Sequence, residues 1–214
     1  MKIEIAVCGV GGQGVVTMSA VIGEICVRRG LNVVAAETHG MAQRMGSVEV
    51  FVRIGDVEAP LISPASADYV VALEMVEALR GVRYLKRCGW ILVSNIYIPP
   101  PGSDRVPSRR QVIELLSKLP IKMIVIDVEE IINRLEDPRV VNMAMLGALL
   151  SFKDISKILP IDVAEDVVQG MLGSVNREAL AMGYRQALEK MNNGNGIYVS
   201  NVCTYSTAPS SNQG

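Results

Sequence analysis

A glycine-rich segment near the amino terminus is the first candidate for chemistry. Gly9, Gly11 and Gly14 fit the pattern G-x-G-x-x-G, and Gly12 adds a fourth glycine. The segment follows a short run of Ile and Val and precedes apolar residues at helical spacing, which predicts a strand, a tight turn and a helix. Such a turn lets an anion approach the backbone N–H groups at the positive end of the helix. The same glycines also suit a turn that only packs the helix against the sheet, and both interpretations stay open.

A polar loop is the second candidate. It contains Thr38, His39, Gln43 and Arg44, and His39 is the only histidine of the chain. The loop follows a predicted strand, and open α/β sheets bind ligands at the carboxyl ends of their strands. Arg44 could pair with a carboxylate or phosphate through two N–H groups, and His39 could donate a hydrogen bond or carry a proton near neutral pH. The alternative is a solvated loop in which Arg44 only bridges to a carboxylate of the same fold.

An NAD(P) site is a competing interpretation of the same residues. Such a site has an acid at the end of the second strand, and Glu37 lies there. The chain then enters the polar loop where a crossover helix would start, which counts against a dehydrogenase. An NAD(P)-dependent dehydrogenase and a non-catalytic nucleotide-binding module therefore remain as alternatives.

The elements around these residues alternate between strands and helices. Residues 3–8, 15–29 and 31–36 predict a βαβ unit with a parallel pair of strands. Residues 47–54 then alternate apolar and polar, and 57–62 could return as a second strand, so a β-hairpin is expected in place of the second crossover helix.

Further strands and helices follow. Strands are predicted at 67–73, 90–94 and 121–128, and helices at 75–87, 108–119, 140–151, 162–172 and 176–191. We predict an α/β fold: a Rossmann-like three-layer sandwich with a mostly parallel sheet, a β-hairpin insertion and C-terminal helices. The predicted domain spans 1–191. Residues 192–214 are rich in Asn, Gly and Ser and predict a tail that is disordered or docked on a partner.

The composition favours a partner protein. Half of the residues (50%) are hydrophobic and the mean hydropathy is +0.31, which suggests surplus apolar surface. The net charge of -1 and the pI of about 5.9 do not indicate nucleic-acid binding. The longest apolar run, 140–152, is too short to span a bilayer, so no membrane insertion is expected. Residues 1–7 resemble a strand and lack the apolar region of a signal peptide, which predicts a cytoplasmic protein.

The cysteines are widely spaced. Cys8, Cys26, Cys88 and Cys203 form no CxxC motif, so neither a zinc site nor an iron–sulfur cluster is expected in this chain. Separated thiols also fit a reducing compartment.

Two segments together resemble a known family. Residues 9–15 (Gly-Val-Gly-Gly-Gln-Gly-Val), followed by 37–44 (Glu-Thr-His-Gly-Met-Ala-Gln-Arg) and 46–48, resemble the gamma-type subunit of 2-oxoacid:ferredoxin oxidoreductases. The His-Gly-Met-Ala-Gln-Arg string is most similar to the indolepyruvate type. The resemblance continues at 67–74, 141–147 and 176–184 and covers roughly residues 3–190. One departure is Met45, where the family usually has glycine.

The resemblance implies a subunit that is inactive alone. In this family a large partner subunit holds thiamine diphosphate, Mg²⁺ and [4Fe–4S] clusters, and the small subunit helps enclose the active site and the coenzyme A channel. The implied reaction is oxidative decarboxylation of a 2-oxoacid to an acyl-CoA, with ferredoxin as electron acceptor. The candidates for catalysis are His39 and Arg44, and no metal ligand is expected. The candidates for cofactor binding are Gly9, Gly11, Gly12, Gly14, Thr38 and Gln43.

Overall fold

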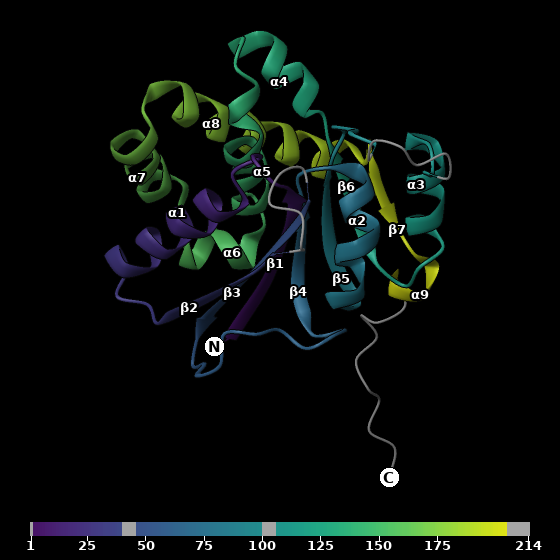
Figure 1. The fold of residues 1–214 in the computed structure, drawn as a ribbon, viewed down its shortest axis with the longest axis horizontal. Helices are drawn as coiled ribbons and strands as arrows, with labels where there is room; N and C mark the ends of the chain where they lie inside the picture. The colour runs from purple at the N-terminus through teal and green to yellow at the C-terminus, as the bar shows by residue number, and fades with distance from the viewer. Residues whose placement is uncertain (1, 40–45, 100–105, 205–214) are drawn as a thin grey trace.

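The computed structural model describes residues 2–39, 46–99 and 106–204, and in them seven strands form one sheet in the order β2-β3-β1-β4-β5-β6-β7 (Figure 1). The strands are β1 (Lys2–Val10), β2 (Val33–His39), β3 (Ser47–Gly55), β4 (Ala67–Ala72), β5 (Leu85–Ser94), β6 (Lys122–Ile126) and β7 (Ile197–Val199). The neighbours β1, β4, β5 and β6 are parallel, whereas β3 is antiparallel to β1 and β2, and β7 is antiparallel to β6.

Helices cover both faces of the sheet. One face carries α1 (Val15–Arg28), α4 (Val128–Leu135), α5 (Val141–Leu150), α6 (Lys153–Ile158), α7 (Ile161–Leu172) and α8 (Ser174–Asn193). The other carries α2 (Met75–Gly81) and α3 (Arg109–Ser117). The alternation of β1 explains the two layers, because Ile5 and Val7 face the first set of helices and Ala6 and Cys8 face the second. This confirms the predicted three-layer α/β fold.

The predicted parallel pair at the start of the chain is wrong. The strands β1 and β2 are not neighbours, because β3 lies between them and Val52 pairs with both Ile5 and Ala35. Val50, Phe51 and Val52 are all buried, so both faces of β3 are covered. A strand that is buried on both faces belongs inside a sheet rather than at its edge.

The β-hairpin exists, but its partner strand was predicted wrongly. The strand that pairs with β3 from the preceding part of the chain is β2, and residues 57–62 form no strand. Since β3 is already paired on both sides, it has no free edge for a third strand. The guanidinium of Arg53 instead donates hydrogen bonds to the carbonyls of Ala59 and Leu61, and Pro60 has no N–H for a ladder.

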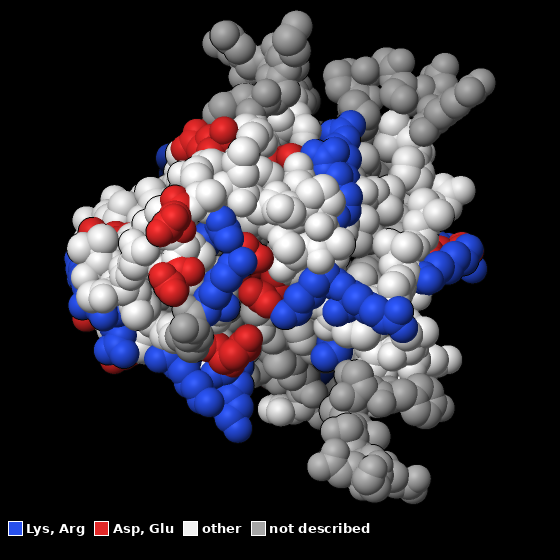
Figure 2. All heavy atoms as spheres, turned by 90° about the horizontal axis from the view of Figure 1, so that it is seen from below, with Lys and Arg blue, Asp and Glu red and all other residues white. Residues whose placement is uncertain are grey.

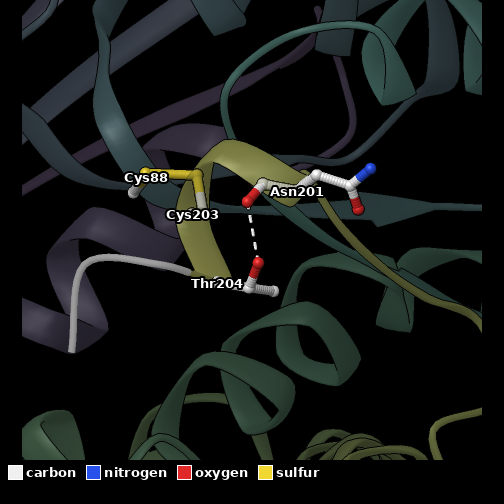
Figure 3. The surroundings of a disulfide bond; sticks show 4 residues. All are labelled: Cys88, Asn201, Cys203 and Thr204. Atoms are coloured by element: carbon white, nitrogen blue, oxygen red, sulfur yellow. Dashed lines mark hydrogen bonds between the residues drawn. A yellow bond between two sulfur atoms is a disulfide. The ribbon is translucent and has the colours of Figure 1, made fainter. Parts of the chain in front are cut away.

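The segment after residue 191 differs from the predicted tail. The helix α8 continues to Asn193, β7 pairs with β6, and a short helix α9 (Asn201–Thr204) follows. A disulfide joins Cys88 to Cys203, with 5.3 Å between their Cα atoms (Figure 3). The expectation of four separated thiols is therefore wrong, because β7 pairs with β6 and α9 then carries Cys203 to Cys88 on β5. Residues 205–214 lie outside the described residues.

The lower face of the molecule carries charges of both signs. Figure 2 shows lysines and arginines lying among aspartates and glutamates on this face. Glu4 forms ion pairs with Lys2 at 2.9 Å and with Arg53 at 2.8 Å, and Lys86 pairs with Asp68. Within the described ranges, no helix has the length and apolar character needed to cross a membrane.

Candidate functional site

The glycine turn between β1 and α1 is closed by a side chain. The backbone N–H of Val10 donates to Oε1 of Gln13 at 2.8 Å, and the N–H of Gln13 donates back to the carbonyl of Val10 at 3.0 Å. The Gln13 amide also donates to the carbonyl of Leu73 at 3.2 Å. Gln13 therefore fixes the turn and ties the end of β1 to the end of β4, a role that the glycine pattern alone does not reveal.

The structure favours glycine at the four candidate positions for different reasons. A Cβ at Gly9 would lie 2.8 Å from the Val15 side chain, so Gly9 is required for close packing. Gly14 has φ of +77° and a Cβ there would lie 2.3 Å from Nδ2 of Asn142. Gly12 has φ of +100° but faces open space. Packing explains Gly9 and Gly14, while Gly11 and Gly12 lie where a ligand could approach.

Asn142 lies beneath this turn, although it is far away in the sequence. It is buried at the start of α5, and its Nδ2 donates to the carbonyl of Gly14 at 3.2 Å. The same carbonyl accepts the N–H of Met18 at 2.9 Å, which is the first hydrogen bond of α1. Asn142 thus holds the junction of turn and helix.

The position of Asn142 depends on a close crossing of α5 and α8. A Cβ at Gly147 would lie 1.9 Å from the carbonyl oxygen of Leu180, and one at Gly183 would lie 1.9 Å from that of Ala144. Since no side chain fits between the backbones, the two glycines set how deeply α5 lies in the layer. The three separated segments 9–15, 141–147 and 176–184 form one connected packing unit.

A cavity of about 400 Å³ opens at the amino end of α1. It is lined by Val10, Gly11, Gly12, Gly14, Val15, Val16, Thr17 and Val48. Among the described residues no side chain caps the first turn of α1. The free N–H groups of such a turn, together with the helix dipole, favour an anionic group.

The polar loop returns to the sheet at this turn. The N–H of Gly11 donates to the carbonyl of Gly46 at 2.9 Å, so the carboxyl end of the loop is joined to the glycine turn. His39 ends β2 in register with Val48, which lines the cavity. Thr38 is exposed on β2, where its hydroxyl donates to the carbonyl of Glu49 at 3.4 Å, and it does not line the cavity. Gln43, Arg44 and Met45 lie outside the described residues.

The geometry of Glu37 argues against an NAD(P) site. Glu37 pairs with Val50 on β3, and Val50 in turn pairs with Val7 on β1. The acid is therefore two strand spacings from β1, or about 10 Å. A dinucleotide site needs the acid on the strand next to the glycine turn.

Glu74 is a buried acid that the sequence analysis did not select. It follows the carboxyl end of β4, is fully buried, and caps α2 by accepting the N–H of Glu77 at 3.0 Å. Its other oxygen accepts the N–H of Ile98 at 2.9 Å. Burial raises the pKa of the Glu74 carboxyl above its usual range. The signal in the sequence was an acid placed directly after a buried strand and before a helix.

The described residues offer no set of metal ligands. In the parts of the chain that the structure describes, no three His, Cys, Asp or Glu side chains come together as a metal site. Cys8 and Cys26 are free thiols buried on β1 and α1. Burial raises the pKa of Cys26 to about 11, so this thiol stays protonated at neutral pH.

Comparison with known proteins places the chain in a family. The profile of the family described as pyruvate ferredoxin/flavodoxin oxidoreductase matches residues 4–186. The chain belongs to this family. It is 40% identical over 196 residues to an indolepyruvate oxidoreductase subunit of Archaeoglobus fulgidus, covering 88% of this chain and 96% of the relative. It is 29% identical to a pyruvate/ketoisovalerate oxidoreductase common subunit gamma of Thermococcus litoralis, covering 88% and 96%.

A solved structure has the same fold. The gamma subunit of a keto/oxoacid ferredoxin oxidoreductase from Geobacter sulfurreducens superposes with a TM-score of 0.66 at 22% identity, covering 87% of this chain and 99% of that one. The resemblance stated from the sequence is confirmed: the chain is a small subunit of the ferredoxin-dependent 2-oxoacid oxidoreductase type. The match to the family ends at residue 186, before β7 and α9.

Proposed function

We propose that this chain is the small subunit of an oxidoreductase that acts on indolepyruvate or a similar aryl-2-oxoacid. The reaction converts the 2-oxoacid and coenzyme A to an acyl-CoA, CO₂ and a proton, and passes the released electron pair to ferredoxin. The observation that carries the substrate class is the 40% identity to an indolepyruvate oxidoreductase subunit, against 29% to a pyruvate/ketoisovalerate gamma subunit.

The cysteines and acids that the structure describes in this chain are not arranged to bind the cofactors of this reaction. Two of its four cysteines are joined in a disulfide, and the other two are buried on different elements. No described cluster of acids could hold Mg²⁺. The electron sink and the redox relay of such a reaction belong to cofactors. We assign thiamine diphosphate, Mg²⁺ and the [4Fe–4S] clusters to a large partner subunit.

The role that we propose for this chain in the reaction is to bind an anionic group. The cavity at the amino end of α1 has the size of a small-molecule site and combines apolar walls with backbone N–H groups. The loop that returns to Gly11 brings Gln43 and Arg44 near this cavity in our proposal, with Arg44 pairing a phosphate or carboxylate. His39 donates a hydrogen bond or moves a proton, and Thr38 holds the end of β2 to β3 through its hydrogen bond to the carbonyl of Glu49. Coenzyme A and the 2-oxoacid both carry suitable anionic groups.

The substrate class is tested with the assembled complex. We expect kcat/KM for ferredoxin reduction with indolepyruvate to exceed that with pyruvate or ketoisovalerate by about tenfold or more, since pocket contacts of a few groups give differences of that order. A complex that prefers pyruvate or ketoisovalerate would overturn the aryl assignment but leave the subunit assignment intact.

The cytoplasm is the compartment that we propose for the complex. Fractionation of the native cells, followed by detection of this chain, tests the location directly. Recovery mainly with membranes or outside the cell would contradict it.

A further inference from the structure

The segment 194–204, here called the C-terminal strap, lies beyond the part of the chain that matches the family. The family match ends at residue 186, within α8. The strap contains β7 and α9, and β7 lies along β6 at the edge of the sheet (Figure 1). The strap therefore lies beyond the matched part of the chain and covers the outer edge of β6.

The non-covalent contacts of the strap are few. The strand β7 has three residues, of which Tyr198 and Val199 are each 40% exposed, and Val202 on α9 is 47% exposed. The ladder is extended by Val125 N–H to the carbonyl of Gly196 at 3.0 Å and by Ser200 N–H to the carbonyl of Ile121 at 3.2 Å. So short and exposed an edge strand adds little burial, and local opening is expected to cost little free energy.

The buried contact of the strap is concentrated at its disulfide. Cys203 is the one buried residue of the strap, and it is bonded to Cys88 on β5 (Figure 3). Cys88 has φ of +59°, a left-handed conformation that L residues adopt rarely, and its N–H donates to the carbonyl of Pro120 at 2.8 Å. Cys88 thus lies at an irregular, half-buried position of β5 that solvent can reach.

Cys8 and Cys26 differ from Cys88, which is half-buried. Cys8 and Cys26 are fully buried, and burial raises the pKa of both thiols. Thiol–disulfide exchange needs a thiolate and an accessible sulfur. Of the four cysteines, Cys88 is the half-buried one, so we expect a reductant to attack the disulfide at Cys88 rather than at the buried Cys203.

We propose that Cys88–Cys203 is a thiol–disulfide exchange site whose oxidation state decides whether the strap stays on β6. A dithiol reductant supplies the electrons: one of its thiolates attacks a sulfur of the pair, the S–S bond breaks, and the leaving thiolate takes up a proton. The second thiol of the reductant then resolves the mixed disulfide and releases the other cysteine. The chain gains two thiols, and the reductant becomes a disulfide.

The two states differ at the edge of the sheet. In the oxidised chain the strap covers the backbone groups of β6. In the reduced chain the strap is held only by its short ladder, so it opens and leaves β6 as an exposed edge that can pair with another strand. The oxidised form is the one protected from such pairing.

Hydrogen exchange of the full chain, with and without dithiothreitol, tests the proposal. We expect the amides of 196–203 and of Val125 to exchange at least about tenfold faster after reduction, while those of β1 and β4 are unchanged. Alkylation of the reduced native chain should modify Cys88 and Cys203 and spare Cys8 and Cys26. The result does not depend on enzymatic activity and is independent of the proposed function.

Cys203→Ser and Cys88→Ser serve as matched controls. Both should exchange at the rate of the reduced chain and show no response to the reductant. Equal exchange of the strap in oxidised and reduced wild-type chain would overturn the proposal, because the ladder alone would then hold the strap. Faster hydrogen exchange throughout the sheet after reduction would also overturn the proposal, because the disulfide would then stabilise the whole fold rather than the strap.

Discussion

At the scale of single residues, the glycine turn depends on side chains as much as on missing ones. Gln13 closes the turn, and Asn142 supports its last carbonyl from another helix. The pattern of Gly9, Gly11 and Gly14 could be recognised in the sequence because it is local. The contact of Asn142 with Gly14 spans 128 positions, and no local periodicity encodes it.

Gly14 and Asn142 should show coupled effects on stability. Gly14→Ala should lower the free energy of unfolding by about 3 kcal/mol, because it adds a left-handed Ala and a clash with the amide. Asn142→Ala should cost about 1 kcal/mol for the lost hydrogen bond. The double variant should cost about 1 kcal/mol less than the sum, since the clash is gone. Denaturant unfolding of the four proteins measures this, and strict additivity would contradict the contact.

Arg44 and His39 should affect catalysis rather than assembly. In the complex, Arg44→Ala and His39→Ala are each expected to lower kcat/KM by about ten- to a hundredfold, the value of a charged or directional contact. Arg29→Ala at the far end of α1 is the matched control and should retain the parent activity. Steady-state kinetics of the assembled complex measures kcat/KM for each variant. Values within about twofold of the parent for both variants would move the site to the large subunit.

Glu74 should make stability depend on pH. Burial raises the pKa of its carboxyl in the folded state, so the folded chain binds more protons than the unfolded chain above the ordinary value of 4.5. The resulting stabilisation is present below that pH and is lost as pH rises through the folded pKa. The free energy of unfolding of the parent should therefore fall relative to Glu74→Gln from about pH 4 upward. A parallel pH profile for the two proteins, measured by denaturant unfolding, would contradict this.

At the scale of elements, most strands and helices follow from periodicity, and the exceptions have physical causes. The helix expected over 75–87 ends at Gly81, because a 3₁₀ turn follows at Val82–Tyr84 and β5 begins at Leu85. The helices α4 and α6, of eight and six residues, were missed, although α4 is strongly amphipathic. The place of β3 between β1 and β2 was missed because strand order depends on tertiary pairing.

The crossing of α5 and α8 should tolerate no side chain at its glycines. Gly147→Ala and Gly183→Ala are each expected to lower the free energy of unfolding by about 3 kcal/mol or more, since each Cβ would meet a backbone carbonyl at 1.9 Å. Gly170→Ala, on the exposed face of α7 with open space around it, is the control and should stabilise by about 0.5–1 kcal/mol. Thermal or denaturant unfolding compares them. An equal change in the free energy of unfolding for all three variants would show that α5 and α8 are not in such close contact.

At the scale of the whole molecule, the chain has the fold of a small subunit of this family, and the residues that the structure describes hold no cluster of metal ligands. The fold and the family were predictable because the motifs recur in order along the chain. The disulfide and the strap were not, since they join Cys88 to a segment 115 positions away and lie beyond the family match. The polar loop at 40–45 and its contacts remain a prediction.

The most direct test of the account is purification of the tagged chain from its native cells, followed by an assay of the complex and of the isolated chain. We predict a stable complex with a larger chain that carries thiamine diphosphate and iron–sulfur clusters and that reduces ferredoxin with a 2-oxoacid and coenzyme A. The isolated chain should be colourless and inactive. Recovery of this chain only as a monomer or homo-oligomer, or 2-oxoacid oxidation by the pure chain, would contradict the account.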